Sequence, residues 1–199
     1  MINDERMVAF INSFDKGNTS FLNQIEKEAR ADAVPIIRTE TQILEVGTAV
    51  GFSALLMQEY APAGAQVTTI EKYEKRIPIA LENFKRAGKE DAITFLCGDA
   101  TEILKELQGE YDFIFMDAAK AQYIHFLPEA TRLLKKGGLL VSDNVLQDGD
   151  VLESRFAVTR RNRTIHARMR EYLYALTHHE QLETVILPVG DGVSISTKV

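Results

Sequence analysis

Short apolar runs alternate with amphipathic stretches through most of this chain, and no other feature restricts its fold as strongly. The apolar runs predict strands at Gln42–Val46, Gln66–Glu71, Ala92–Leu96, Tyr111–Met116 and Leu139–Ser142. The stretches between them predict helices at about Phe52–Tyr60, Tyr73–Ala87, Thr101–Leu107 and Gln122–Leu134. Strands that alternate with helices in this way predict an α/β domain, in which a mostly parallel sheet carries helices on both faces.

The two ends of the chain depart from this alternation. Glu183–Val189 and Val193–Lys198 predict two strands joined by Gly190–Gly192, a sequence typical of a hairpin turn. The predicted sheet therefore has seven strands and ends in an antiparallel hairpin, unlike a plain dinucleotide-binding fold. Before the sheet, Asn3–Phe14 and Thr19–Ala31 predict helices outside the repeating unit.

Length and composition indicate one domain. The 199 residues contain no repeat, low-complexity stretch or linker, so we expect residues 1–199 to form a single domain that starts with helices in residues 1–35. No run approaches the roughly 18 apolar residues of a membrane span, and the start lacks the layout of a signal peptide. The single cysteine, Cys97, suits a reducing compartment and is expected in the core. We therefore expect a cytoplasmic protein with no membrane association.

The first predicted strand leads into ILEVGTAVGFS, whose glycines predict a ligand-binding turn. Gly47 and Gly51 allow the backbone to turn tightly and approach a ligand, at the point where the next helix presents free N–H groups. The spacing E-x-G-x-x-x-G differs from the G-x-G-x-x-G of nicotinamide sites. Glu45, at the end of the strand, suits a cationic ligand such as S-adenosylmethionine. A strand-to-helix turn without a ligand is the alternative.

Two further acids close the next two predicted strands. Glu71 is placed to accept hydrogen bonds from ribose hydroxyls, and Asp99 with Ala100 is placed to border an adenine ring. Each acid alone is more often a solvated helix cap. Together with Glu45, however, they close three successive strands, which indicates one ligand crevice at the carboxyl ends of the sheet.

A candidate metal site follows the fourth and fifth predicted strands. Asp117 ends the fourth strand, and Asp143 and Asn144 end the fifth. Two carboxylates and an amide oxygen suit Mg²⁺ and leave positions for water and substrate, whereas no His/Cys cluster favours zinc. Lys120 follows Asp117 by three residues. Because a nearby dication disfavours the ammonium form of a lysine, Lys120 is a candidate general base, with an exposed helix lysine as the alternative.

In these motifs the chain resembles the catechol and caffeoyl-CoA type O-methyltransferases, a metal-dependent branch of the class I methyltransferases with a Rossmann-like fold. The resemblance covers about Gln42–Val199 and rests on ILEVGTAVG, TIEK, GDA, FMDAAKAQY, GGLLVSDNV and PVGDGVSIS. It implies S-adenosylmethionine as cofactor, Lys120 as catalytic base, and Mg²⁺ bound by Asp117, Asp143 and Asn144. Cofactor contacts are implied for Glu45, Gly47, Ser53, Glu71, Ala100 and Asp117.

DAAKAQY, SDNVL and PVGDG resemble more narrowly the bacterial tRNA 5-hydroxyuridine methyltransferases, which act on the wobble position. Although the chain has a net charge of −6, the stretch from Arg155 to Arg170 contains no acid and has arginines at 155, 160, 161, 163, 168 and 170. An arginine-rich helix beside the active-site mouth would bind phosphates of a tRNA anticodon loop. The alternatives for the arginine stretch are a solvated helix face or a dimer contact. The alternative for the whole chain is an O-methyltransferase of catechol-like or caffeoyl-CoA-like molecules.

One region departs from the family pattern. Only Ile36–Thr41 separate Val34-Pro35 from the first strand, where the family has a further helix over cofactor and substrate. Either that helix is deleted or a stretch of chain is absent from the sequence, and the intact motifs favour the second explanation. The resemblance also implies a homodimer formed through the N-terminal helices. A noncatalytic RNA-binding module would leave the metal and base residues unexplained.

Overall fold

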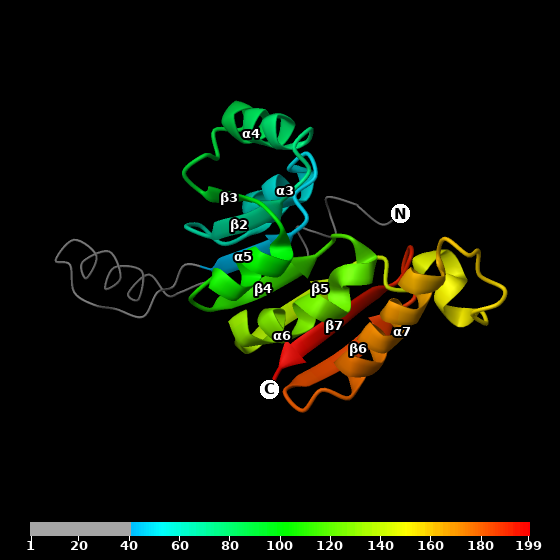
Figure 1. Ribbon diagram of the computed structural model, residues 1–199. Coiled ribbons are helices and arrows are strands. Elements are labelled where there is room, and N and C mark those ends of the chain that lie inside the picture. The colour runs from blue at the N-terminus through cyan, green and yellow to red at the C-terminus, as the bar shows by residue number, and fades with distance from the viewer. Residues whose placement is uncertain (1–40) are drawn as a thin grey trace. The chain divides into compact units, whose positions relative to one another are not determined.

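The computed structural model describes residues 41–199, which fold around one seven-stranded sheet (Figure 1). Its strand order is β3-β2-β1-β4-β5-β7-β6. The parallel strands are β1 (Gln42–Val46), β2 (Gln66–Glu71), β3 (Ile93–Cys97), β4 (Tyr111–Met116) and β5 (Leu134–Ser142). The hairpin of β6 (Leu182–Leu187) and β7 (Val193–Lys198) is antiparallel and joins the sheet through β7 and β5. The predicted fold class is confirmed.

Helices cover both faces of the sheet. Successive side chains of a strand point to opposite faces, so the apolar strands present an apolar surface on each side for helices to cover. On one face, α3 (Phe52–Tyr60) and α4 (Ile77–Arg86) share an apolar cluster with strand residues such as Ile43 and Val67. On the other face lies a larger cluster that includes Leu44 and Ile114. It is covered by α5 (Ala100–Glu106), α6 (Tyr123–Leu133) and α7 (Arg163–Thr177). The short 3₁₀-helices η1 (Lys120–Gln122) and η2 (Gln147–Leu152) follow β4 and β5.

Two buried tyrosines fix the carboxyl ends of β4 and β5 in the larger cluster. The rings of Tyr123 and Tyr172 pack edge to face, with centroids 5.4 Å apart. The Tyr123 hydroxyl donates to the carbonyl oxygen of Met116 at 3.1 Å and lies 3.3 Å from that of Asp143. The Tyr172 hydroxyl pairs with the Ser142 hydroxyl at 2.6 Å. Burial raises the pKa of both phenols, so they remain protonated at neutral pH and can donate these bonds.

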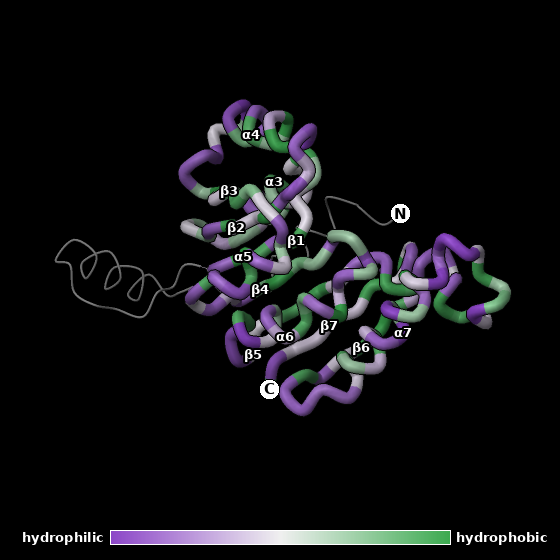
Figure 2. Tube along the Cα trace, viewed as in Figure 1, coloured by the Kyte–Doolittle hydropathy of each residue, from purple (hydrophilic) through white to green (hydrophobic). Residues whose placement is uncertain are grey.

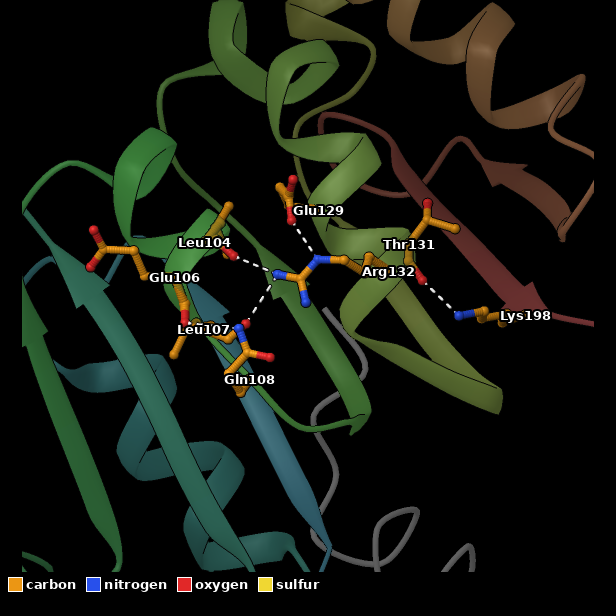
Figure 3. A network of polar contacts seen from close by, with 8 residues as sticks. All are labelled: Leu104, Glu106, Leu107, Gln108, Glu129, Thr131, Arg132 and Lys198. Atoms are coloured by element: carbon orange, nitrogen blue, oxygen red, sulfur yellow. Dashed lines mark hydrogen bonds and ion pairs between the residues drawn. The ribbon is translucent and has the colours of Figure 1, made fainter.

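Two cationic side chains satisfy carbonyl groups at helix ends (Figure 3). Arg132 donates to the carbonyl oxygens of Leu104 and Leu107 at 2.9 and 3.0 Å, where α5 ends, and pairs with Glu129. Lys198 donates to the carbonyl oxygens of Thr131 and Leu134 at 2.8 and 2.7 Å. The last carbonyls of a helix lack partners within that helix, and these side chains supply the missing donors. The contacts also connect α5 to α6 and β7 to the end of α6.

Several boundaries differ from the predicted ones. Helix α4 begins at Ile77 rather than Tyr73, because the chain first makes a turn in which the Arg76 N–H donates to the Tyr73 carbonyl. Strand β5 begins directly after α6, five residues before its predicted start. Cys97 is exposed and not in the core, which corrects the prediction. It ends β3, an edge strand, and this position follows from a strand order that local sequence does not reveal.

The predicted N-terminal helices, the segment Ile36–Glu40 and the single-domain assignment of residues 1–199 involve residues outside those the structure describes. The predicted homodimer, which would use the same helices, is likewise untested. Within residues 41–199, no helix has the length and apolar character needed to cross a membrane.

Candidate active site

The strand order creates a crevice at the carboxyl ends of β1 and β4. The chain proceeds from β1 outward to β2 and β3, and from β4 outward to β5, so neighbouring connections diverge at this point. A cavity of about 730 Å³ lies here, a volume in the range of small-molecule sites. Four of the residues predicted to contact the cofactor line it, namely Gly47, Glu71, Ala100 and Asp117.

Gly47 allows the loop after β1 to pass directly over the end of β4. Its φ is +111°, and a Cβ built there would lie 2.0 Å from the backbone oxygen of Asp117. Gly51 is restricted in the same way, since its φ is +85° and a Cβ would lie 2.5 Å from the Phe84 ring. Both glycines are therefore required for contacts within the protein, in addition to any approach to a ligand.

The Glu71 carboxylate is held at the cavity wall by backbone groups. It accepts hydrogen bonds from the N–H groups of Ala49 at 2.9 Å, Lys72 at 2.9 Å and Tyr73 at 2.8 Å. These donors come from the glycine-containing loop and from the turn after β2. They fix one orientation of the carboxylate in advance of ligand binding, which suits its predicted role as a ribose acceptor.

Asp99 both lines the cavity and caps α5. Its carboxylate accepts from the Thr101 N–H at 2.9 Å and from Lys72 Nζ at 3.0 Å. The hydrogen bond from Thr101, followed by that from Lys72, lowers the pKa of Asp99 to about 2. The helix-cap alternative is thus realised at this residue, and Ala100 beside it is left to face the cavity.

Glu45 and Ser53 lie behind the loop and are not among the residues that line the cavity. Glu45 is fully buried, and its carboxylate accepts hydrogen bonds from the hydroxyls of Ser53 and Thr69. Thr69 pairs in turn with the Thr48 hydroxyl. Burial raises the pKa of Glu45 to about 7, despite the two hydroxyl donors. Direct contact of Glu45 or Ser53 with a cofactor stays a prediction; their observed contacts support the loop from below.

The structure brings the predicted metal ligands together at the ends of β4 and β5. These strands pair in register up to Met116 and Ser142, and the Asp143 N–H donates to the Met116 carbonyl at 3.0 Å. Asp117 and Asp143 therefore leave adjacent strands at the same level. Asn144 adopts a left-handed conformation with φ of +55°, and its N–H donates to Asp143 Oδ1 at 2.7 Å.

Lys120 reaches the same group of oxygens. Its Nζ donates to Asn144 Oδ1 at 2.9 Å. Burial raises the pKa of Asp117, the negative charge of Asp143 raises it further, and the Lys120 ammonium opposes both effects. Asp117 is exposed and Asp143 partly buried, and two carboxylates that repel each other form a site that a cation would stabilise.

The chemistry of the donors fits Mg²⁺ better than zinc. Asp117, Asp143 and Asn144 offer only hard oxygen ligands, too few to fill an octahedral shell. In the part of the chain that the structure describes, no group of three or more His, Cys, Asp or Glu is arranged to hold a metal. Asn144 is an amide, so the predicted set contains only two residues of these four types, and metal binding by it stays a prediction.

Sequence reasoning missed two features of this site. The first is Tyr123, whose hydroxyl links the backbone at the ends of β4 and β5. The second is the attachment of α7 beside Lys120, since Arg168 Nη1 donates to the carbonyl oxygen of Ala121 at 3.1 Å. The only sequence signal for either was an aromatic or basic residue in a helix, which does not identify its partner.

The predicted arginine group separates into two kinds. Arg163, Arg168 and Arg170 each donate to a backbone carbonyl, at 3.4, 3.1 and 2.8 Å. Arg155, Arg160 and Arg161 are exposed, and no ion pair among residues 41–199 includes them. Three of the arginines therefore bond to the backbone, and three are exposed without an ion pair to another described residue.

A mostly parallel seven-stranded sheet that ends in an antiparallel hairpin is the fold of the Rossmann-like methyltransferases. The cavity at its carboxyl edge is lined by the acids Glu71, Asp99 and Asp117, whereas a nicotinamide site has closely spaced glycines. The model of an O-methyltransferase family matches residues 33–199, and the chain belongs to this family. The resemblance to the catechol and caffeoyl-CoA type enzymes is confirmed at this level, and so is S-adenosylmethionine-dependent O-methyl transfer as the class of reaction.

Individual relatives agree with this assignment. Caffeoyl-CoA O-methyltransferase of Populus kitakamiensis is 33% identical over 162 residues, which span 78% of this chain and 69% of that protein. Catechol O-methyltransferase of Niastella koreensis is 37% identical over 115 residues, 56% of this chain and 52% of that protein.

Among solved structures, a Staphylococcus aureus protein provisionally assigned as a caffeoyl-CoA O-methyltransferase is 30% identical, with a TM-score of 0.75 and coverage of 98% and 100% of the two chains. The S-adenosylhomocysteine-bound methyltransferase PaMTH1 of Podospora anserina is 25% identical, with a TM-score of 0.73 and coverage of 100% and 97%.

Proposed function

We propose that this O-methyltransferase depends on Mg²⁺ and methylates 5-hydroxyuridine at the wobble position of tRNA to 5-methoxyuridine. One observation carries the chemistry: Asp117, Asp143 and Asn144 meet at the ends of adjacent strands, and Lys120 Nζ lies 2.9 Å from Asn144 Oδ1. Oxygen ligands and a potential base thus occur in one place, beside the cavity proposed for the methyl donor.

The cavity residues suit S-adenosylmethionine. Glu71 would accept the ribose hydroxyls with its oriented carboxylate, and Ala100 would border the adenine. Asp117, which lines the cavity near the metal ligands, would face the positively charged end of the cofactor. Gly47 and the hydrogen-bonded pair of Glu45 and Ser53 would hold the loop at the distance the cofactor needs. Much of the rate enhancement would come from holding donor and acceptor aligned.

Asp117, Asp143 and Asn144 would hold the metal, which when bound polarises two adjacent acceptor oxygens and makes the hydroxyl more acidic. In 5-hydroxyuridine those oxygens are the 5-hydroxyl and the 4-carbonyl. Lys120 Nζ would take the hydroxyl proton, and the oxygen would then attack the methyl group in line with the departing sulfur. The contact between Lys120 and Asn144 supports this role, because it holds Nζ beside a proposed metal ligand.

The choice of tRNA rests on Arg155, Arg160 and Arg161. These exposed cations follow the metal ligands in the chain, on a protein whose net charge is −6. Phosphates of an anticodon loop are partners of the matching charge. A second candidate acceptor is a catechol-like or caffeoyl-CoA-like small molecule, because the relatives carry those names and such compounds also offer adjacent oxygens.

Methyl transfer from labelled S-adenosylmethionine tests the proposal. Undermodified tRNA carrying 5-hydroxyuridine and a catechol are offered in parallel, each with Mg²⁺ and with a chelator. We expect metal-dependent label in the tRNA at higher efficiency than in the catechol. Label in the catechol alone would retain the chemistry and replace tRNA with a small molecule. Equal transfer in the presence of the chelator would remove the metal from the proposal.

A further inference from the structure

The segment between η2 and α7, residues 153–162, exposes an aromatic ring that the catalytic site does not use. Phe156 is 87% exposed, the highest value among the large hydrophobic side chains of the described residues, and Leu152 just before the segment is 76% exposed. Figure 1 shows the segment in yellow, projecting beyond the start of α7. In Figure 2 it carries a hydrophobic stretch between hydrophilic ones.

The segment is attached to the body of the protein at both ends. Asn162 Nδ2 donates to Asp150 Oδ2 at 3.0 Å, and His166 Nε2 donates to the carbonyl oxygen of Glu153 at 3.0 Å. Within it, Val158 is buried and the Ala157 N–H donates to the Ser154 carbonyl at 2.9 Å. Phe156 is therefore presented on an anchored turn, although Val158 two residues later is packed inside.

The same segment is connected to the catalytic residues. Arg170 Nη1 donates to the carbonyl oxygen of Val151, where η2 nears its end, at 2.8 Å. Arg168, two residues earlier on α7, donates to the carbonyl oxygen of Ala121, the neighbour of Lys120 in the chain. Helix α7 thus fixes the position of the exposed segment relative to the base and the metal ligands.

Exposed arginines flank the exposed ring. Arg155 precedes Phe156 directly, and Arg160 and Arg161 follow it by four and five residues. The exposed acid in this stretch is Glu153, so cations are in excess. An exposed aromatic ring among arginines is the combination that binds single-stranded nucleic acid: bases stack on the ring and phosphates pair with the cations.

We propose that residues 153–161 form an RNA-binding surface in which Phe156 stacks on an unpaired base while Arg155, Arg160 and Arg161 contact the flanking phosphates. This inference rests on the proposed function and deepens it, because it names the residues that recognise the acceptor. A bare arginine patch would bind RNA by charge alone, whereas the ring selects unpaired bases over duplex.

The test measures binding of a synthetic anticodon stem-loop carrying 5-hydroxyuridine, by fluorescence anisotropy over a series of salt concentrations. Phe156→Leu is expected to weaken binding roughly tenfold with little change in salt dependence. The double substitution R160Q/R161Q is expected to lower the slope of log affinity against log salt by about 2. S-adenosylmethionine binding, measured by calorimetry, should stay at the wild-type value in both.

Two control variants match these substitutions outside the segment. Tyr174→Leu removes an exposed aromatic ring on α7, and Arg86→Gln removes an exposed arginine on α4. Both should bind the stem-loop as the wild type does. Equal losses in the control variants, unchanged binding by Phe156→Leu, or no binding of the stem-loop by the wild type would each overturn the inference. A change in oligomeric mass with unchanged RNA binding would assign Phe156 to a protein contact and overturn it too.

Methyl transfer to tRNA, measured on the same proteins, separates the two proposals. If the stem-loop binds through Phe156 but receives no methyl group, the inference stands and the proposed function fails. If the wild type methylates tRNA and the Phe156 and arginine variants match it in binding and turnover, the proposed function stands and the inference fails.

Discussion

The buried carboxyl group of Glu45 should make the stability of this protein depend on pH in a way that one substitution removes. Glu45 is fully buried, and hydroxyl groups of Ser53 and Thr69 contact its two oxygens. Hydroxyls donate or accept, so a glutamine at this position can keep both contacts. Glu45→Gln therefore removes the ionisation while retaining the volume and the hydrogen bonds.

The magnitude follows from the pKa. Burial raises the pKa of Glu45 from 4.5 to about 7, so the folded state holds this proton more tightly than the unfolded state. The stabilisation from protonated Glu45 is complete below 4.5 and is lost as the pH rises through about 7. Between about pH 5 and about pH 8, the ionisation of Glu45 should lower the free energy of unfolding by about 2.5 kcal/mol.

The assay is urea unfolding of wild type and Glu45→Gln, free of cofactor and metal, at pH values across that range. Other titrating groups contribute equally to both proteins, so the informative quantity is the difference in free energy of unfolding. The variant should gain about 2.5 kcal/mol over the wild type between about pH 5 and about pH 8. A difference that stays constant, or that changes in the opposite direction, would refute the assignment of Glu45 as a buried group that protonates near neutrality.

Three further substitutions test the base, the loop and the helix end. Lys120→Ala should lower kcat by roughly 10²–10⁴-fold while calorimetric S-adenosylmethionine affinity is retained; equal loss of both would contradict the base role. Gly47→Ala should lower the free energy of unfolding by about 1–3 kcal/mol more than Gly109→Ala, because both have positive φ but only at Gly47 would the added Cβ lie 2.0 Å from a backbone oxygen. Arg132→Met, which removes the donor to the part-buried Leu104 carbonyl and to the exposed Leu107 carbonyl, should cost about 1–2 kcal/mol in urea unfolding. The exposed-pair control Lys105→Met should cost under about 1 kcal/mol, and equal costs would show that the helix-end contacts add nothing.

The order of elements and the location of the site were predictable from local sequence. Apolar runs with acids at their ends indicate both the strands and the edge of the sheet where the cavity lies. Since β4 and β5 are parallel neighbours, Asp117 was expected beside Asp143 and Asn144, and the structure places them at the same level. The predicted contact of Lys120 with this group is present as well.

Contacts between distant parts of the chain were not predictable. Glu45 shares the strand face of Ile43, and only the packing of α3 shows that Ser53 closes over it. Gly47 fits against the backbone of Asp117, 70 residues later in the sequence, and no local pattern encodes that approach. Cys97 was expected in the core because its neighbours are apolar, but β3 is an edge strand.

The arginines illustrate the same limit. Their sequence is uniformly basic, and yet Arg168 and Arg170 bind backbone carbonyls of η1 and η2 while Arg160 and Arg161 face solvent. Only the position of α7 shows which arginines of this stretch bond to the backbone and which face solvent. The sequence therefore predicted a basic surface along the whole stretch, whereas the exposed arginines without backbone contacts are those that precede α7.

The claim that Asp117, Asp143 and Asn144 hold a catalytic Mg²⁺ is tested most directly by the rate of methyl transfer as a function of Mg²⁺ concentration. Wild type and Asp143→Asn are compared at saturating S-adenosylmethionine, on whichever acceptor the wild type methylates. We predict a saturable Mg²⁺ dependence in the wild type, no transfer with chelator, and a much higher Mg²⁺ requirement in the variant. Wild-type transfer that persists at full rate with chelator, or an unchanged Mg²⁺ requirement in Asp143→Asn, would contradict the metal site.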